Sequence, residues 1–181
     1  MRARNLSFTA LFVTLTAVGA FLKIPFLFSS ITLQFFFTAL AGILLGARYG
    51  ALSQLVYVVL GLIGLPIFTM GGGVGYFLYP TFGFLLGLIP AAWVIGKLAK
   101  RRSGTMGLLI ACLTGLFVLY LIGLPYMALI LNAYLGKDMD FRAICAVGML
   151  PFLPGDCVKI AATVYLGKRL LPRLSCAYKE K

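Results

Sequence analysis

Six long runs of apolar residues, separated by short polar or glycine-rich connections, account for most of the chain. Each run suits a membrane-crossing helix, which needs about 20 apolar residues. A membrane β-barrel would alternate apolar and polar residues in strands of about ten, and lipid tolerates only helices or closed barrels. We therefore predict an all-α fold: a polytopic six-transmembrane-helix bundle forming a single integral membrane domain, residues 1–181. The predicted segments are roughly Leu6–Leu22, Ile31–Ala47, Gly50–Leu65, Tyr76–Leu98, Met106–Leu131 and Phe152–Leu171.

The connections between these runs carry further expectations. Only Arg48 and Tyr49 separate the second run from the third, which predicts a tight turn. The part from Ala143 to Leu150 is apolar but too short to span, so we expect an interfacial or re-entrant piece. The first run is longer than the apolar region of about 7–15 residues in a secretory signal, so we interpret it as a retained helix.

Composition and charge agree with a membrane protein and predict its orientation. The chain is 62% hydrophobic and 11% charged, against about 45–50% and 25% in soluble domains. The charged residues that give the net charge of +12 lie mostly between apolar runs. The charge therefore indicates membrane topology rather than nucleic-acid binding. Cytoplasmic loops collect lysine and arginine. With the N-terminus inside, twelve basic residues face the cytoplasm and three face outward, which predicts a multi-pass protein of the cell membrane with both termini cytoplasmic. The inner set is Arg2, Arg4, Arg48, Lys97, Lys100, Arg101, Arg102, Lys168, Arg169, Arg173, Lys179 and Lys181, and the outer set is Lys23, Lys137 and Arg142.

One acid lies within the apolar runs, and it marks the strongest candidate for chemistry. Asp156 is followed three residues later by Lys159, so both lie on one helix face. A charge in the bilayer costs about 2.5–3.5 kcal/mol on insertion scales and indicates a function or a pairing. A purely structural ion pair is the alternative. The chain has no histidine, no clustered cysteines and no phosphate loop, so we expect no metal or cofactor and no enzyme activity.

Other polar or glycine-rich positions gather in the predicted outer half. An outward-opening pocket for a small molecule would use such a mixture of apolar walls and a few polar groups. Interhelical hydrogen bonds, an ordinary external loop or an aromatic belt are the alternatives. The candidates are Thr32, Gln34, Gly72, Gly73, Tyr79, Thr81, Tyr126 and Asn132. Ala10 and Thr14 in the first run form a small-xxx-small pair, which suits packing within the bundle or docking of a partner helix.

Several collinear segments resemble a known family. They are TALFVTLTAVGAFLKIPF at 9–26, TLQFFF at 32–37, ILLGARYGALS at 43–53, GLIGLPIFTMGGG at 61–73, YPTFGFLLGL at 79–88 and PFLPGDCVKIA at 151–161. Together they are similar to the biotin-specific substrate-binding (S) component of energy-coupling factor (ECF) transporters, the BioY family.

The resemblance implies a six-helix subunit that binds biotin at its outer face. It also implies a transmembrane coupling protein and two cytoplasmic ATPases as partners, which bind the ATP. Asp156 and Lys159 become the leading ligand contacts, with Gln34, Gly71–Gly73 and Tyr79–Thr81 lining or closing the pocket. An S component for another vitamin, such as riboflavin or thiamine, is the alternative, and a membrane enzyme or a channel subunit is a more distant one.

Overall fold

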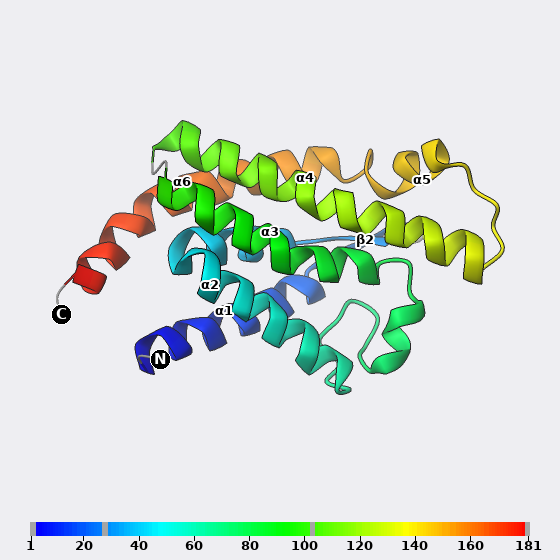
Figure 1. Cartoon of the computed structure of the whole chain (residues 1–181), viewed down its shortest axis with the longest axis horizontal. Helices are drawn as coiled ribbons and strands as arrows, with labels where there is room; N and C mark the ends of the chain where they lie inside the picture. The colour runs from blue at the N-terminus through cyan, green and yellow to red at the C-terminus, as the bar shows by residue number, and fades with distance from the viewer. Residues whose placement is uncertain (1–2, 27–28, 102–103, 180–181) are drawn as a thin grey trace.

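The computed structural model describes residues 3–26, 29–101 and 104–179, without the side chains of residues 24–31 and 173–179. Arg2, Arg102 and Lys181 of the predicted inner set lie outside these residues. The described chain is mainly helical, which confirms the predicted fold class (Figure 1). The helices are α1 (Ala3–Phe21), α2 (Gln34–Leu62), α3 (Phe82–Arg101), α4 (Thr105–Leu129), α5 (Phe141–Gly148) and α6 (Leu153–Lys179). Two short helical turns, η1 (Val74–Leu78) and η2 (Ile130–Tyr134), and the strands β1 (Lys23–Phe26) and β2 (Ser29–Thr32) complete it.

Helix α2 is two antiparallel arms joined at Gly46. This glycine has φ 77° and ψ 176°, a conformation that side-chain-bearing residues avoid. The arms then run back along each other, so close that a Cβ added to Gly50 would lie 2.9 Å from the Cα of Gly42. Helix α3 packs closely against this turn through Gly96, where an added Cβ would lie 2.3 Å from the amide nitrogen of Ala47. The predicted tight turn between the second and third runs is therefore present, but it lies at Gly46 and not at Arg48 and Tyr49, which belong to the second arm; the arms are 34–45 and 47–62.

Within the described residues, four helices are long and apolar enough to cross a membrane: α1, α2, α3 and α4 continued through η2. Helices α5 and α6 meet at a bend of 49° and count as a fifth span if taken together. Because α2 folds back on itself, these elements supply the six predicted segments. The short piece expected between residues 143 and 150 is α5 with the turn after it, and it runs into α6 rather than forming a separate loop.

The two ends of the bundle differ in what they carry. Both termini and the α3–α4 connection lie at one end, and the β1–β2 hairpin, η1 and α5 lie at the other (Figure 1). The hairpin pairs Lys23 with Thr32 and Phe26 with Ser29, where the sequence indicated only a loop. Pro25 contributes to this local structure because a proline holds the residue before it in an extended conformation.

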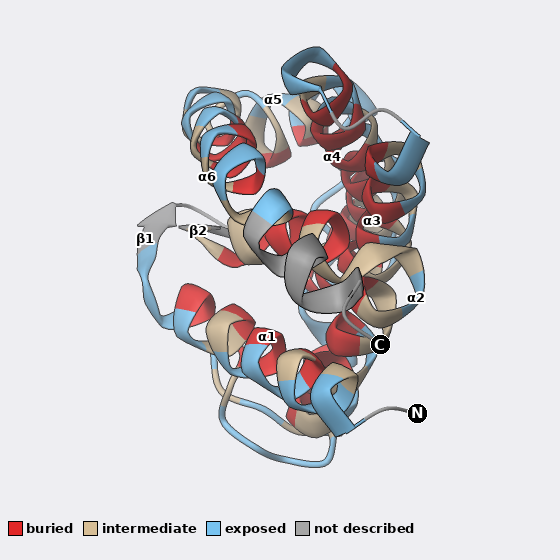
Figure 2. Cartoon of the chain, turned by 90° about the vertical axis from the view of Figure 1, so that its left-hand side faces the viewer, coloured by how far each residue is buried: buried red, intermediate tan, exposed pale blue. Residues whose placement is uncertain are grey.

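Helix α3 forms the centre of the bundle, between α2 and α4. Its small residues, such as Ala91 and Ala92, are fully buried and let the neighbouring backbones approach closely. Helix α1 packs on α2 through a face that includes Phe12 and Thr16, and its outer face is exposed. Viewed from the end that bears the termini, the buried residues lie on the inward faces of the helices (Figure 2).

Candidate functional site

A cavity lies in the half of the bundle opposite the termini. Its empty space amounts to about 650 Å³, including the part that is open to solvent. Helices α2, α3, α4 and α6 form its walls, with contributions from β2 and the segment between α2 and α3. Its lining is Thr32, Gln34, Phe35, Thr69, Tyr76, Thr81, Phe84, Leu85, Leu88, Leu119, Tyr120, Gly148, Phe152, Asp156 and Lys159. Apolar and aromatic side chains thus surround a few polar groups, as in small-molecule sites generally.

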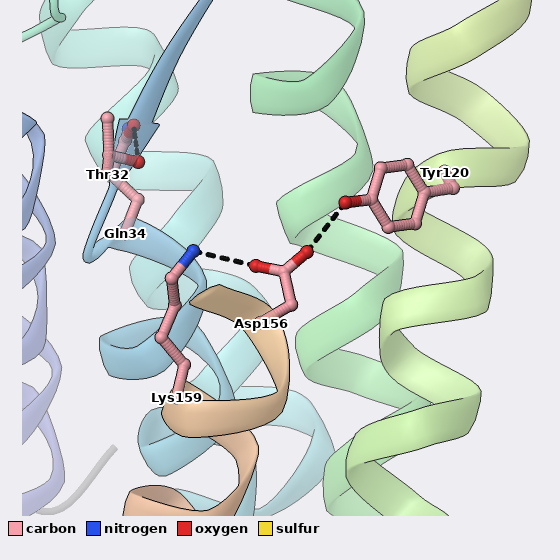
Figure 3. A network of polar contacts seen from close by, with 5 residues as sticks. All are labelled: Thr32, Gln34, Tyr120, Asp156 and Lys159. Carbon is pink, nitrogen blue, oxygen red and sulfur yellow. Dashed lines mark hydrogen bonds and ion pairs between the residues drawn. The ribbon is translucent and has the colours of Figure 1, made fainter. Parts of the chain in front are cut away.

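An ion pair with a tyrosine partner forms the most polar part of the cavity (Figure 3). Lys159 Nζ donates to Asp156 Oδ1 at 2.7 Å, and the hydroxyl of Tyr120 donates to Asp156 Oδ2 at 2.6 Å. Asp156 is 4% and Lys159 8% exposed. The carboxylate stands in the first turn of α6, where the positive end of the helix dipole favours it. Both oxygens of the buried carboxylate therefore have a donor, and the lysine keeps two N–H groups for another partner.

A second polar group faces the same cavity from the β2–α2 junction. Thr32 Oγ1 donates to Gln34 Oε1, and Gln34 Nε2 donates to the hydroxyl of Tyr57, both at 2.9 Å. Tyr57 in turn donates to the backbone carbonyl of Ile67, also at 2.9 Å. This chain of hydrogen bonds ties the cavity wall to the segment that follows α2.

Aromatic side chains and two polar contacts hold the segment between α2 and α3 over the bundle. Phe68 is buried between Tyr57 and Tyr76, with ring centroids 5.5 and 4.6 Å away. Thr69 shares a hydrogen bond of 2.8 Å with the hydroxyl of Tyr76. Lys23 of β1 donates to the backbone carbonyl of Thr69, so the hairpin and this segment are joined at the cavity end of the molecule.

Five of the predicted ligand contacts lie together in the cavity lining: Thr32, Gln34, Thr81, Asp156 and Lys159. The other five lie outside this lining, and each has other contacts within the protein. Gly72 packs on the carbonyl of Leu65, where a Cβ would lie 2.1 Å from the oxygen, and Gly73 donates to the carbonyl of Gly61 at 2.7 Å.

The three side chains among them also have structural partners. Tyr79 stacks on Tyr76 with ring centroids 4.9 Å apart. The hydroxyl of Tyr126 donates to the carbonyl of Phe77 at 2.6 Å. The amide of Asn132 bonds both backbone groups of Met139. Contacts of this kind arise from the course of the chain in space, which the pattern of polar outliers does not reveal.

Tyr120 is the most important residue that the sequence did not single out. It lies inside the long apolar run that became α4, 36 positions before its partner Asp156. The available signal is general: a buried tyrosine hydroxyl needs a hydrogen-bond partner. That rule does not say which tyrosine of nine lies at the depth of the ion pair. Among the described residues, no cluster of histidine, cysteine or acidic side chains suits a metal ion.

The fold and the cavity are those of a multi-pass α-helical membrane protein with a cavity in one half of its bundle. Comparison with known sequences agrees over nearly the whole chain. The profile of the BioY family matches residues 1–175. The chain belongs to the BioY family, as the quoted motifs predicted.

Individual relatives support the same assignment. The probable biotin transporter BioY of Lysinibacillus sphaericus is 43% identical over 92% of this chain and 86% of its own length. The biotin transporter BioY of Thermotoga maritima is 36% identical, covering 92% of this chain and 95% of the relative. A crystal structure of the S-component for biotin from an ECF-type ABC transporter superposes with a TM-score of 0.81 at 28% identity, covering 93% of this chain and 91% of that one. The family is one of transporter components and not of enzymes.

Proposed function

We propose that this chain is a biotin-binding S component, which captures biotin at the outer face of the membrane for ATP-driven import by partner subunits. The observation that carries the proposal is the buried Asp156–Lys159–Tyr120 group at the polar end of an otherwise apolar and aromatic cavity. The names of its relatives favour biotin over riboflavin or thiamine. The family favours binding without catalysis. So does the pairing of the Asp156 carboxylate, since both its oxygens already accept hydrogen bonds from Lys159 and Tyr120.

The chemistry of the polar end suits the ureido ring of biotin. That ring has two N–H donors and one carbonyl acceptor. Asp156 and the oxygen of Tyr120 keep lone pairs that accept, and Lys159 keeps two N–H groups that donate. A ligand carboxylate in the same place would pair with Lys159, but it would lie against the negative charge of Asp156 and leave the acceptors of Asp156 and Tyr120 unused. We therefore place the ureido ring here and the apolar tail along the aromatic walls.

The charge distribution supports an orientation with both termini in the cytoplasm. The described basic residues of the predicted inner set lie on elements that reach the end bearing the termini: α1, the α2 turn, the end of α3 and the second half of α6. By the positive-inside rule this end faces the cytoplasm. The cavity then opens outward, as uptake requires. We further propose that residues 1–181 act as a single membrane domain.

The exposed face of α1 is the proposed docking site for the coupling protein. Ala10 and Thr14 are exposed, whereas the opposite face of α1 packs on α2. The pair therefore does not serve packing within this bundle. Ala10→Trp and Thr14→Trp should abolish co-purification with the coupling protein and its two ATPases while leaving biotin binding intact. Co-purification at the wild-type level would exclude this face.

Binding of labelled biotin to the purified protein without ATP tests the central proposal. Asp156→Asn and Lys159→Ala should each weaken binding at least about tenfold, the effect of losing roughly 1.4 kcal/mol. Asp138→Asn and Lys97→Ala, at exposed positions, are the matched controls. Riboflavin and thiamine, tested by thermal shift, should stabilise the protein less than biotin. Undetectable biotin binding, or unchanged affinity in both site variants, would contradict the proposal.

A further inference from the structure

In the hydrogen-bond chain from Thr32 to Ile67, the carbonyl of Ile67 determines which group donates and which accepts in every bond. The carbonyl of Ile67 can only accept, so the single hydroxyl hydrogen of Tyr57 is directed to it. The oxygen of Tyr57 is then an acceptor for its other neighbour, and only the Nε2 side of the Gln34 amide can donate to it. Gln34 Oε1 therefore faces Thr32, whose hydroxyl donates.

A reversed amide would be costly in this arrangement. It would set Gln34 Oε1 against the oxygen of Tyr57 with no hydrogen between them, at a position where Gln34 is 6% exposed and Tyr57 is fully buried. Unpaired polar groups in such surroundings are unfavourable. The orientation of an amide is commonly ambiguous between its nitrogen and its oxygen, but here the chain of donors and acceptors permits one choice.

The part of Gln34 that remains available defines what the cavity wall can recognise. One of its two N–H groups is used by Tyr57, and one lone pair of Oε1 is used by Thr32. Among the hydrogen bonds of the described residues, the second N–H and the second lone pair are unused, and Gln34 lines the cavity. Their positions are set by Tyr57, which does not line the cavity itself.

We propose that Tyr57 is a specificity-determining positioning residue: through its hydroxyl it holds the Gln34 amide so that a ligand meets its donor and acceptor in one fixed order. The inference rests on the proposed function, since the ligand is taken to be biotin. The packing of the Tyr57 ring on Phe68, 5.5 Å between centroids, does not need the hydroxyl. Tyr57→Phe therefore removes the orienting bond and keeps the packing.

A double-mutant cycle tests the inference with ligand. Tyr57→Phe should weaken biotin binding about tenfold, the size of one lost hydrogen bond. In a Gln34→Ala background the same substitution should change the affinity by less than about twofold, because Tyr57 acts through Gln34. The control Thr38→Val breaks the bond to Gln54 between the same two arms and should leave the affinity unchanged. Equal effects of Tyr57→Phe in both backgrounds, or no effect in either, would overturn the inference.

A ligand-free measurement separates this inference from the proposed function. The chain has only two glutamines, Gln34 and Gln54, so a sample labelled with ¹⁵N in glutamine side chains shows two amide groups. Tyr57→Phe should shift the Gln34 signals and increase their exchange with water, and Thr38→Val should shift those of Gln54 alone. If wild-type protein fails to bind biotin, the proposed function is wrong, and these spectra still decide the role of Tyr57. A Gln34 amide unaffected by Tyr57→Phe would refute it.

Discussion

The two glutamines of α2 lie at neighbouring levels of its two antiparallel arms. They differ in how many hydrogen bonds their side-chain amides make within the protein. Gln54 is fully buried and has three partners: it accepts from Thr38 and donates to Ser53 and Thr16. Gln34, one turn nearer the cavity end, has two partners and keeps a donor and an acceptor toward the cavity. The same residue type therefore joins helices at one level and presents binding groups at the next.

The comparison teaches how to interpret polar residues inside a membrane bundle. A buried polar group such as the Gln54 amide, whose two N–H donors are both used within the bundle, stabilises the contact between helices. A buried polar group that lines the cavity and has capacity left over is a candidate ligand contact, since leaving it unpaired is unfavourable. Asp156 and Lys159 belong to the second kind, because the lysine still has two unused donors. The following substitutions break or sharpen this distinction, beginning with the largest expected effect.

Lys159→Met should cause the greatest loss of stability. It leaves the buried carboxylate of Asp156 without its cation, which lowers the free energy of unfolding by about 3–5 kcal/mol. The double variant Asp156→Leu/Lys159→Met removes both charges and should recover most of that loss, although neither variant should bind biotin. Thermal unfolding in detergent without ligand measures both. A double variant no more stable than the single one would show that the pair has a different structural role.

Gln54→Leu and Gln34→Leu should separate stability from binding. Gln54→Leu should lower the free energy of unfolding by about 1–2 kcal/mol, mainly through loss of its hydrogen bonds to Thr16 of α1 and Thr38 of the other arm, with no change in biotin affinity well below the melting temperature. Gln34→Leu should destabilise the protein less but weaken biotin binding about tenfold. Unfolding curves and equilibrium binding on the same preparations provide the two quantities. The distinction fails if both substitutions alter binding equally.

Tyr120→Phe and Tyr126→Phe form a closely matched pair. Each hydroxyl donates one bond of 2.6 Å, to Asp156 and to the carbonyl of Phe77 respectively. Loss of either bond should lower the free energy of unfolding by about 1 kcal/mol. Only Tyr120→Phe should also weaken biotin binding, by about fivefold to tenfold, because it leaves one oxygen of the cavity carboxylate without its donor. Weaker binding in Tyr126→Phe would place that residue in the site after all.

Thr163→Val should have the smallest effect, and of opposite sign. The hydroxyl of Thr163 is buried on α6, one turn beyond Lys159, and has no hydrogen-bond partner among the described residues. Valine has nearly the same shape without the unsatisfied group, so the free energy of unfolding should rise by about 0.5–1 kcal/mol. Biotin affinity should not change. A loss of stability in thermal unfolding would mean that the hydroxyl has a partner.

The amino-acid sequence predicted the elements well because each signal was local. Apolar runs close to the length that crosses a membrane, separated by short connections, indicate helices and their order whatever the neighbours are. The reversal in α2 was detectable because two polar residues, Arg48 and Tyr49, interrupt the apolar runs, although the chain turns slightly earlier, at Gly46. The i, i+3 spacing placed Asp156 and Lys159 on one helix face, and the structure pairs them.

Residues whose contacts depend on the course of the chain in space were harder to predict from the sequence. The β1–β2 hairpin was predicted only as a loop. Strand pairing is a contact between two segments, and it leaves no periodic pattern of apolar residues within either segment. Gly72, Tyr126 and Asn132 appeared as candidates for a pocket because they are polar or small at the predicted outer level. The structure places them on backbone groups of the connections, since depth in the membrane does not fix the direction of a side chain.

By itself, the sequence determined that this protein is a six-segment membrane bundle with one embedded ion pair, because hydropathy and charge act residue by residue in lipid. Only the tertiary structure decided that Tyr120 is a partner of the ion pair and that Tyr57 is a partner of Gln34. Both tyrosines lie within apolar segments, 36 and 23 positions from their partners. Hydrogen bonds across such distances depend on which helix faces meet, and that follows from packing of the whole bundle.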